Sequence, residues 1–170
     1  MNKTGKRGAG PAAGRKPARS ADDFAVRKTP TGLGLFANRA FTRGDFVIEY
    51  TGALLPNDLA DSKGGRYLFR VNSRWTIDGT GRENMSRYIN HSCKPNCVAY
   101  TSGLKIRIYA RRAIAPGEEL AYDYGKEYFD AYIRPRGCGC PGCAGGSAGV
   151  EASAGARGPG RRAERGEGAA

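Results

Sequence analysis

The chain has 170 residues, which is enough for one folded domain with tails. Hydrophobic residues make up only 39%, and 26 residues are glycine, so part of the chain is expected not to fold. Half of the net charge of +12 lies in residues 1–20, which disfavours a compact nucleic-acid-binding domain because the remainder is only mildly basic.

The N-terminal segment, residues 1–21, is predicted to be a basic disordered tail. A solvated leader explains it better than phosphate binding, although weak nucleic-acid contact through counterion release stays open. It has no apolar run, which disfavours a secretory signal or a membrane anchor, and no stretch of the chain approaches about 18 consecutive apolar residues. The chain is expected to be intracellular, where an odd number of cysteines favours metal or thiol chemistry.

Short β-strands separated by Gly and Pro turns dominate the predicted fold. In chain order, strands are expected at 24–28, 46–50, 67–71, 75–77, 104–110 and 120–125. One or two helical turns are expected at 54–62, and no segment favours an amphipathic helix longer than about three turns. The class is therefore mainly β with little helix. The ordered region spans 22–144, and residues 145–170, rich in Gly, Ala and Arg, are expected to be disordered.

The segment 84–97, NMSRYINHSCKPNC, carries the only histidine of the chain and two of its cysteines. Its asparagine and serine side chains compete with regular backbone pairing, so a short helical turn that breaks into a functional loop is expected. A thiol–imidazole dyad of His91 with Cys93 or Cys97 is the weaker interpretation. Side chains two residues apart on a strand share a face without necessarily facing each other.

A second cysteine group, Cys138-Gly-Cys140-Pro-Gly-Cys143, is typical of a metal-binding knuckle. Three thiols within six residues can turn toward one ion, and zinc prefers four tetrahedral ligands. The fourth thiolate would come from Cys93 or Cys97. The alternative is a set of free thiols near the end of the folded region.

Two further patterns are compatible with a ligand pocket. Gly32-Leu33-Gly34 follows Pro30 as a tight turn, either a plain hairpin or a backbone that approaches a ligand closely. Tyr122 and Tyr124 lie on one face of the last strand, either as core residues with polar tips or as pocket lining.

The ordered region resembles the SET domain of the protein-lysine methyltransferases, followed by a cysteine-containing post-SET segment, as in compact, bacterial-type members. The matching pieces occur in the family's order: TGLGLFA at 31–37, RGDFVIEYTG at 43–52, YLF at 67–69, IDGT at 77–80, NMSRYINHSCKPNC at 84–97, ARRAIAPGEELAYDYG at 110–125 and CGCPGC at 138–143. The resemblance implies a SET-domain (β-clip) fold of short curved sheets with a C-terminal pseudoknot. It also implies a SET domain at 22–125 and a post-SET zinc-binding segment at 126–144.

The resemblance also implies the site residues. S-adenosylmethionine would be the methyl donor, held by Gly32, Leu33, Gly34, Asn90 and His91, with Asn84 and Arg87 bracing the loop. Tyr124 matches the catalytic tyrosine, Tyr67 lines the lysine channel, and Tyr122 limits the product to mono- or dimethyllysine. One structural zinc ion would be bound by Cys93, Cys138, Cys140 and Cys143. The second gap of the cysteine knuckle is shorter than the family's commonest form.

The function expected from this resemblance is methyl transfer from S-adenosylmethionine to a lysine of a histone, a histone-like protein or a ribosomal protein. A compact member would work in the cytoplasm or nucleoid of a bacterium, and otherwise in the nucleus. The alternative is a non-catalytic SET-like module that binds nucleic acid or a protein partner through its basic arm. Salt-sensitive DNA binding without donor binding would favour that alternative.

Overall fold

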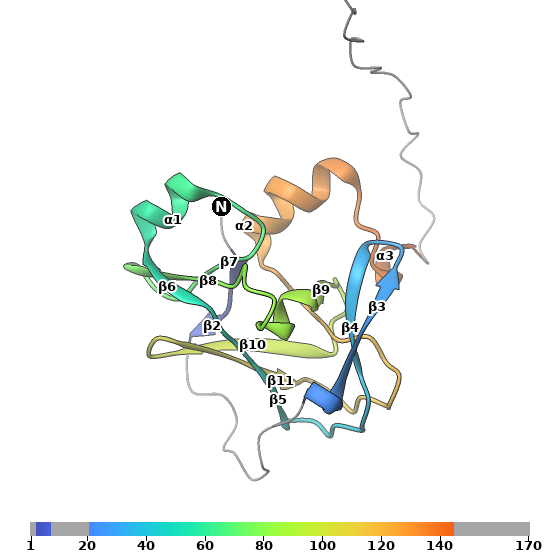
Figure 1. The fold of residues 1–170 in the computed structure, drawn as a ribbon. Coiled ribbons are helices and arrows are strands. Elements are labelled where there is room, and N and C mark those ends of the chain that lie inside the picture. Colours follow the sequence, from blue (N-terminus) through green and yellow to red (C-terminus); the bar gives the residue numbers. More distant parts are fainter. Residues whose placement is uncertain (1–2, 8–20, 145–170) are drawn as a thin grey trace, which may run out of the picture.

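The computed structural model describes residues 3–7 and 21–144 of the chain (Figure 1). Its strands are β1 (Lys3–Thr4), β2 (Lys6–Arg7), β3 (Phe24–Thr29), β4 (Gly32–Ala37), β5 (Phe46–Tyr50), β6 (Ala53–Pro56), β7 (Leu68–Arg70), β8 (Trp75–Asp78), β9 (Asn90–His91), β10 (Cys97–Ser102), β11 (Lys105–Ala110) and β12 (Ala121–Tyr122). Its helical segments are η1 (Ala21–Asp23), α1 (Asn57–Lys63), η2 (Met85–Tyr88), α2 (Lys126–Tyr128), η3 (Phe129–Ile133), η4 (Arg134–Arg136) and α3 (Pro141–Ala144). Among these residues no helix has the length and apolar character needed to cross a lipid bilayer.

Small sheets wrap around one apolar core, so the mainly β fold expected from the sequence is confirmed. Within the described residues, one four-stranded sheet has the order β1-β7-β8-β6 and another the order β2-β10-β11-β5. The pairs β3–β4 and β9–β12 complete the fold. The alternation of strand β11 places Ile106 and Ile108 in the core, against residues such as Val47 and Leu35.

Most predicted strands occur where the sequence pattern placed them, but strands β4, β6 and β10 were missed. Gly32 to Gly34, expected as a tight turn, begin β4, because Thr29 pairs with Gly32 and the turn itself is residues 30–31. Leu54 and Leu55, expected to be helical, lie in β6 because they pair with β8, and α1 begins only at Asn57. The expected strands at 24–28, 46–50 and 104–110 correspond to β3, β5 and β11. Residues 97–102 read CVAYTS, a mixture of small and polar residues with weak strand character. They form a strand because they pair with β11 across a two-residue turn, in which Gly103 adopts a φ of 60°.

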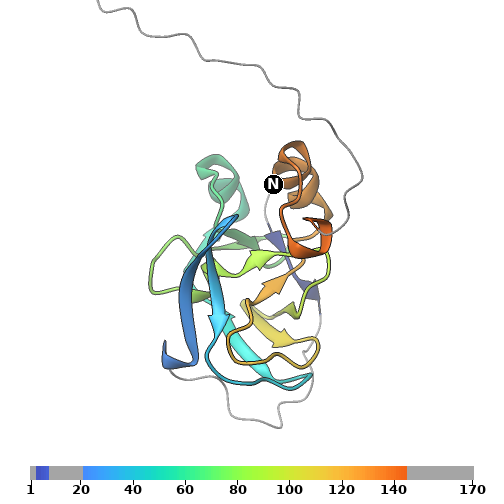
Figure 2. The same cartoon turned by 90° about the vertical axis from the view of Figure 1, so that its right-hand side faces the viewer.

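The C-terminal part of the domain is threaded past the loop after β9. Strands β9 and β12 pair in parallel, with Asn90 opposite Ala121 and His91 opposite Tyr122. The Asn96 side chain then fastens the loop, donating to the Glu119 carbonyl at 2.8 Å and accepting from the Ala121 amide at 2.8 Å. In Figure 2 this crossing lies beside the β3–β4 hairpin and below the C-terminal helical segment.

The N-terminal segment differs from the expected solvated leader over residues 3–7. Strand β1 pairs in parallel with β7, and strand β2 pairs in parallel with β10. These residues are ordered because two sheet edges far away in sequence accept their backbone hydrogen bonds, which no local pattern signals. The rest of the predicted tail up to residue 20, and the predicted tail at 145–170, lie outside the described residues.

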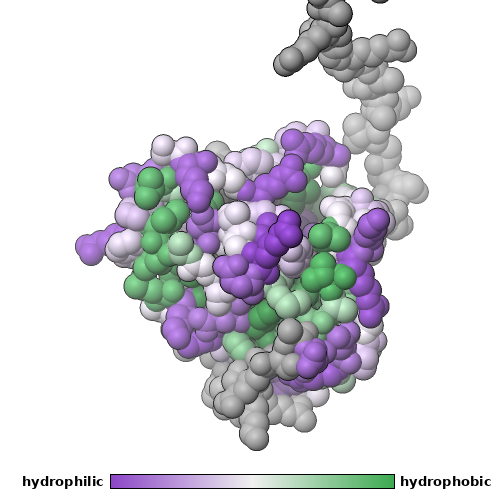
Figure 3. Space-filling view, viewed as in Figure 1, coloured by the Kyte–Doolittle hydropathy of each residue, from purple (hydrophilic) through white to green (hydrophobic). Residues whose placement is uncertain are grey.

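Apolar residues gather in two places on the face shown in Figure 3. One group lies over β6 and α1, where Leu54 and Leu59 are exposed, and the other lies over the β3–β4 hairpin, where Val26 and Leu33 are exposed. Hydrophilic residues separate the two groups.

Gly52 is a position where the fold requires glycine. Its φ is 153°, and a Cβ atom there would lie 2.1 Å from the Asp78 carbonyl oxygen. Gly52→Ala is therefore expected to lower the free energy of unfolding by roughly 2–4 kcal/mol, measured by urea denaturation. Gly103→Ala is the matched control, because Gly103 has positive φ but open space around it, and it should cost only about 1 kcal/mol. Equal losses for both variants would contradict the steric argument.

Candidate active site and metal centre

Three tyrosines from two separate parts of the chain surround a buried lysine amine. Tyr67 precedes β7, Tyr124 follows β12, and Tyr128 ends α2. The Lys3 Nζ atom lies 4.0 Å from the Tyr124 ring centroid, 5.8 Å from that of Tyr67 and 5.5 Å from that of Tyr128. Lys3 is only 2% exposed, so these aromatic rings form the wall of a narrow channel that admits a lysine side chain.

The channel favours the neutral form of the amine. Burial and, to a smaller extent, the Arg87 guanidinium lower the pKa of Lys3 from 10.5 to about 7. Arg87 is itself held in place by stacking on Tyr67, 3.9 Å from its ring centroid, and by a hydrogen bond that it donates to the Thr80 carbonyl. A lysine in this channel can therefore present its lone pair near neutral pH.

Tyr124 is anchored at the end of the threaded segment. Its hydroxyl donates to the Ile89 carbonyl at 2.6 Å, and its backbone amide donates to Nδ1 of His91 at 3.3 Å. Burial raises the pKa of Tyr124 well above its usual value, so the phenol stays protonated. The residue is placed to orient an amine and not to act as a nucleophile.

Tyr122 lies beside Tyr124, with ring centroids 4.9 Å apart, and packs on Phe69. It is fully buried, yet its hydroxyl has no hydrogen-bond partner among the described residues. A buried hydroxyl without a partner costs about 1–3 kcal/mol, and such sites are commonly occupied by a water or a ligand group. The Tyr122 hydroxyl is therefore available to a molecule in the channel.

A separate cleft of about 840 Å³ adjoins the β9–β12 crossing. Its lining comes from the β3–β4 turn, the loop after β9, the segment before β12 and the cysteine knuckle: Thr29, Pro30, Thr31, Asn90, His91, Ser92, Lys94, Asn96, Arg112, Glu118, Glu119, Ala121, Gly139, Cys140, Pro141 and Gly142. This volume is in the range of about 300–1,000 Å³ that small-molecule and cofactor sites occupy. Carboxylates, amides and cationic side chains all face it, which suits a ligand that carries an ammonium, a carboxylate and hydroxyl groups.

The predicted donor-binding residues fall into two groups. Asn90 and His91 line the cleft, and the Asn90 side chain donates to Glu119 at 2.8 Å and to the Leu33 carbonyl at 3.2 Å. Gly34 is packed against this cluster, since a Cβ there would lie 2.4 Å from the Glu119 carboxylate. The start of β4, with Gly32 and Leu33, is thereby tied to the rim of the cleft.

Asn84 and Arg87 lie away from that cleft. Asn84 is buried, donates to the Gly79 carbonyl at 3.2 Å and accepts from the Thr51 amide at 3.3 Å. Arg87 borders the tyrosine channel through its stacking on Tyr67. Neither residue is part of the cleft lining, and their bracing of the loop stays a prediction.

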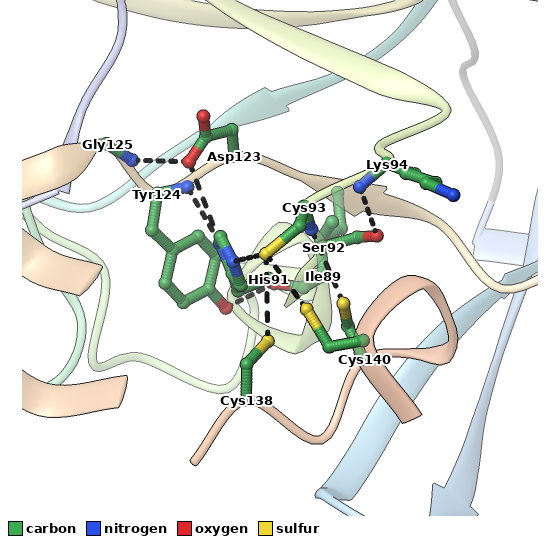
Figure 4. Close-up of polar contacts among 11 residues, drawn as sticks. Ile89, His91, Ser92, Cys93, Lys94, Asp123, Tyr124, Gly125, Cys138 and Cys140 are labelled. Carbon is green, nitrogen blue, oxygen red and sulfur yellow. Dashed lines mark hydrogen bonds and ion pairs between the residues drawn. The ribbon is translucent and has the colours of Figure 1, made fainter. Parts of the chain in front are cut away.

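His91 connects the channel, the cleft and the cysteine cluster (Figure 4). Its ring packs edge-on against Tyr124, and its Nε2 lies 3.4 Å from the Cys93 sulfur. Burial lowers the pKa of His91, outweighing the nearby Asp123 carboxylate, so the ring is neutral at pH 7. Because Nδ1 accepts from the Tyr124 amide, the proton is on Nε2 and points at Cys93.

Four thiols converge on one point, and they come from Cys93, Cys138, Cys140 and Cys143. All four sulfurs lie within 4.8 Å of one another, with Cys93 at 3.8 Å from Cys138 and 3.5 Å from Cys143. Four sulfurs about 2.3 Å from a tetrahedral zinc ion are about 3.8 Å apart, so the donor set fits zinc in chemistry and spacing. Burial opposes ionisation of Cys140, but hydrogen bonds from the Cys93 amide and from the other thiols lower its pKa to about 6.

The choice between Cys93 and Cys97, open from spacing alone, is decided by the fold. Cys97 begins β10 and is buried in the core, outside the cluster. Cys93 contacts His91 as well as the cluster, so the two side chains do meet, contrary to the expectation for residues two apart. Burial and hydrogen bonds from Cys143 and Cys138 raise the pKa of the Cys93 thiol, which argues against a nucleophilic dyad.

Sequence reasoning missed four residues of the site. Tyr128 completes the channel, Asn96 and Glu119 shape the cleft, and Lys3 fills the channel. Asn96 and Glu119 lie inside the motifs KPN and GEEL, and these motifs could have identified both residues from the sequence. Lys3 lies in a basic tail and had no such signal.

Comparisons with known proteins agree with this geometry. A family model described as the SET domain matches residues 32–125. The chain is 42% identical over 126 residues to "Histone-lysine N-methyltransferase, H3 lysine-4 specific" of Schizosaccharomyces pombe, covering 66% of this chain and 14% of that protein. It is 38% identical over 133 residues to "Histone-lysine N-methyltransferase 2D" of Homo sapiens, covering 71% of this chain and 2% of that protein. It is 41% identical over 123 residues to "Histone-lysine N-methyltransferase set1" of Dictyostelium discoideum, covering 65% of this chain and 8% of that protein. The chain thus spans a small fraction of the length of these relatives.

Proposed function

The chain belongs to the SET-domain family, and on that premise we propose that it is a protein-lysine N-methyltransferase that uses S-adenosylmethionine. The observation that carries this proposal is the tyrosine channel, which accepts a lysine side chain and holds its amine with a lowered pKa. A cleft of suitable size and polarity adjoins the same β9–β12 crossing. A binding module would need neither the channel nor the cleft.

The residues of the cleft would hold the donor. Asn90 and Glu119 offer amide and carboxylate groups, and the backbone of β9 and of the start of β4 at residues 32–34 would offer further polar atoms. When bound, S-adenosylmethionine supplies a methyl group on a positively charged sulfur. The chain's own task is then alignment and water exclusion, which together can account for a large part of the rate of a direct displacement.

The channel residues prepare the lysine. The aromatic walls exclude water from the amine and favour its neutral form, which alone has the lone pair needed for attack. Tyr124 fixes the direction of the amine, while its own hydroxyl is held by the Ile89 carbonyl. The proton lost from the methylated amine leaves to solvent.

The activity is tested by incubating the full chain with methyl-labelled S-adenosylmethionine and a panel of histones and other basic proteins. Label in at least one protein, together with donor binding in calorimetry, is expected. Absence of both labelling and donor binding would overturn the proposal and would favour a non-catalytic module.

The expected substrate is a basic protein, with histones first because the named relatives are histone-lysine methyltransferases. A histone-like DNA-compacting protein or a ribosomal protein offers the same chemistry of lysines in extended basic segments. The compartment follows the substrate: the nucleus, or the nucleoid and cytoplasm of a bacterium.

Tyr122→Phe is expected to shift the main product from mono- or dimethyllysine toward trimethyllysine. The Tyr122 hydroxyl lies buried and unpartnered beside Tyr124, so it can hold a water that crowds the amine. Mass spectrometry of a peptide substrate at limiting enzyme would measure the product ratio, with a change of about tenfold expected. Trimethyllysine as the main product of the unmodified chain would refute this role.

A further inference from the structure

We propose that Lys3 is methylated by the chain's own active site, with residues 3–7 lying in the groove that an extended substrate peptide would occupy. This inference rests on the proposed methyltransferase function and names its first substrate. The N-terminal segment would then be an internal substrate and a competitor of external peptides.

The backbone of residues 3–7 joins two sheet edges. Lys3 and Thr4 pair in parallel with Phe69 and Arg70 of β7. After Gly5, Lys6 and Arg7 pair in parallel with Tyr100 and Thr101 of β10. Both β7 and β10 would be edge strands of their sheets without this segment. In Figure 1 the dark blue segment lies between β7 and β10. Edge strands with unpaired backbone groups are templates for an added peptide strand, so the gap between β7 and β10 is a peptide groove.

The side chain of Lys3 enters the channel from this groove. Its amine is surrounded by Tyr67, which precedes β7, and by Tyr124 and Tyr128 from the segment after β12. A lysine that merely covered a surface would keep its amine in water, because burial of an unpaired ammonium is costly. Lys3 instead is 2% exposed, and its amine lies over the aromatic faces of the channel.

The residues after Lys3 fit the groove closely. A Cβ atom on Gly5 would lie 3.1 Å from the Ala99 carbonyl oxygen and 3.3 Å from the Thr101 methyl group. The Thr4 hydroxyl packs against Gly125, directly after Tyr124. A cleft of about 700 Å³ continues from Thr4 and Gly5 along β10. The groove thus favours a lysine followed two residues later by glycine.

The methyl transfer balances as an ordinary displacement. The neutral amine of Lys3 gives its lone pair to the methyl carbon of the sulfonium donor S-adenosylmethionine. The nitrogen–carbon bond forms as the carbon–sulfur bond breaks, and the bonding pair stays on sulfur in S-adenosylhomocysteine. The methylated ammonium then releases one proton to water.

The first test is peptide mass spectrometry of the full chain after incubation with methyl-labelled S-adenosylmethionine. Label on Lys3 is expected, at a first-order rate that does not change when the protein is diluted about tenfold, because tail and groove belong to one chain. A rate that falls in proportion to concentration would overturn transfer within one chain. Lys28, which is exposed, is the internal control and should stay unlabelled.

The second test uses substitutions. Lys3→Arg should remove the label from the tail while methylation of a synthetic peptide of residues 1–10, added in trans, is retained or rises several-fold. Gly5→Val should lower Lys3 labelling at least about tenfold, and Gly5→Ala should lower it less, because the valine adds bulk against Ala99 and Thr101. Unlabelled Lys3 in a chain that methylates a histone would overturn this inference alone. No labelling of any protein and no donor binding would overturn the proposed function.

A third test needs no methyl donor. Amine acetylation at pH 8 with a small anhydride reagent should modify Lys3 at least about tenfold more slowly than Lys28, because Lys3 is buried and Lys28 is exposed. Gly5→Val should raise the acetylation rate of Lys3 toward that of Lys28. Equal rates for the two lysines in the unmodified chain would show that the tail does not occupy the groove.

The pH dependence gives a separate readout. The groups facing the Lys3 amine are the Arg87 guanidinium and the rings of Tyr67, Tyr124 and Tyr128. The docked amine has a pKa of about 7, so its methylation should rise about tenfold per pH unit below pH 7 and level off above it. Between about pH 7 and 10, a free lysine carries a proton that the docked amine lacks. Docking therefore releases a proton in this range, so docking itself should strengthen as the pH rises. A rate independent of pH between 5.5 and about 8 would contradict a buried amine.

Discussion

Tyr124→Phe is expected to lower kcat about a hundredfold or more, with little change in donor affinity. The Tyr124 ring forms one wall of the lysine channel, and its hydroxyl donates to the Ile89 carbonyl. Without the hydroxyl, the ring loses its anchor, and the buried Ile89 carbonyl loses a donor at 2.6 Å. The amine is then less precisely directed, and alignment is the main source of rate in a direct displacement.

Donor binding should survive because Tyr124 is not part of the cleft lining. The measurement is steady-state kinetics with a peptide substrate, together with calorimetry of donor binding. A stability loss of about 1–3 kcal/mol is expected from the unpaired carbonyl, so unfolding should be measured in parallel. Tyr132→Phe is the matched control, because Tyr132 packs on Tyr128 but has an exposed ring. An unchanged kcat in Tyr124→Phe would show that the hydroxyl has no role in orientation.

We propose that the four-cysteine cluster binds one zinc ion, and loss of this ion should have the second largest effect. Cys138→Ser is expected to lower the zinc content from about one ion per chain to well below that, because a tetrahedral site loses one of its four thiolates. The free energy of unfolding should fall by several kcal/mol, since metal binding contributes directly to folding in sites of this kind. Atomic absorption and urea denaturation measure the two effects.

The same change should weaken donor binding more than the chemical step. Gly139, Cys140, Pro141 and Gly142 form one wall of the donor cleft, and the metal would hold this wall in place. KM for S-adenosylmethionine is therefore expected to rise about tenfold or more, while kcat falls less. Chelation of the unmodified chain should reproduce the result and be reversed by added zinc. Cys97→Ala is the control, because Cys97 lies outside the cluster, and it should keep the full zinc content.

Metal binding should also weaken in acid. Thiols must lose their protons to bind zinc, so affinity falls as pH decreases through the range where the cluster reprotonates. His91 lies 3.4 Å from the Cys93 sulfur, and its Nε2 proton stabilises a thiolate there. His91→Ala is expected to lower zinc affinity about tenfold, measured by competition with a chromophoric chelator. Unchanged zinc affinity in this variant would show that His91 does not contribute to metal binding.

Much of the fold was determined by the sequence alone. Period-two alternation and Gly or Pro turns identified β3, β5 and β11, because these strands bury one face and need no distant partner to be recognised. The spacing of Cys138, Cys140 and Cys143 predicted a thiol cluster that can face one ion, and the structure brings these three thiols together with Cys93. Strand β10 was not identified, because its small and polar residues become a strand only when β11 pairs with them.

Only the tertiary structure decided how these parts combine. The parallel pairing of β9 with β12 directs Cys93 to the knuckle and buries Cys97, and it sets His91 against Tyr124. Residues 3–7 were expected to be solvated because their composition offers no apolar surface of their own. Their order comes from the free edges of β7 and β10 and from a channel of three tyrosines. Composition describes what a segment can bury by itself, whereas a groove elsewhere in the fold can supply both the hydrogen bonds and the buried surface.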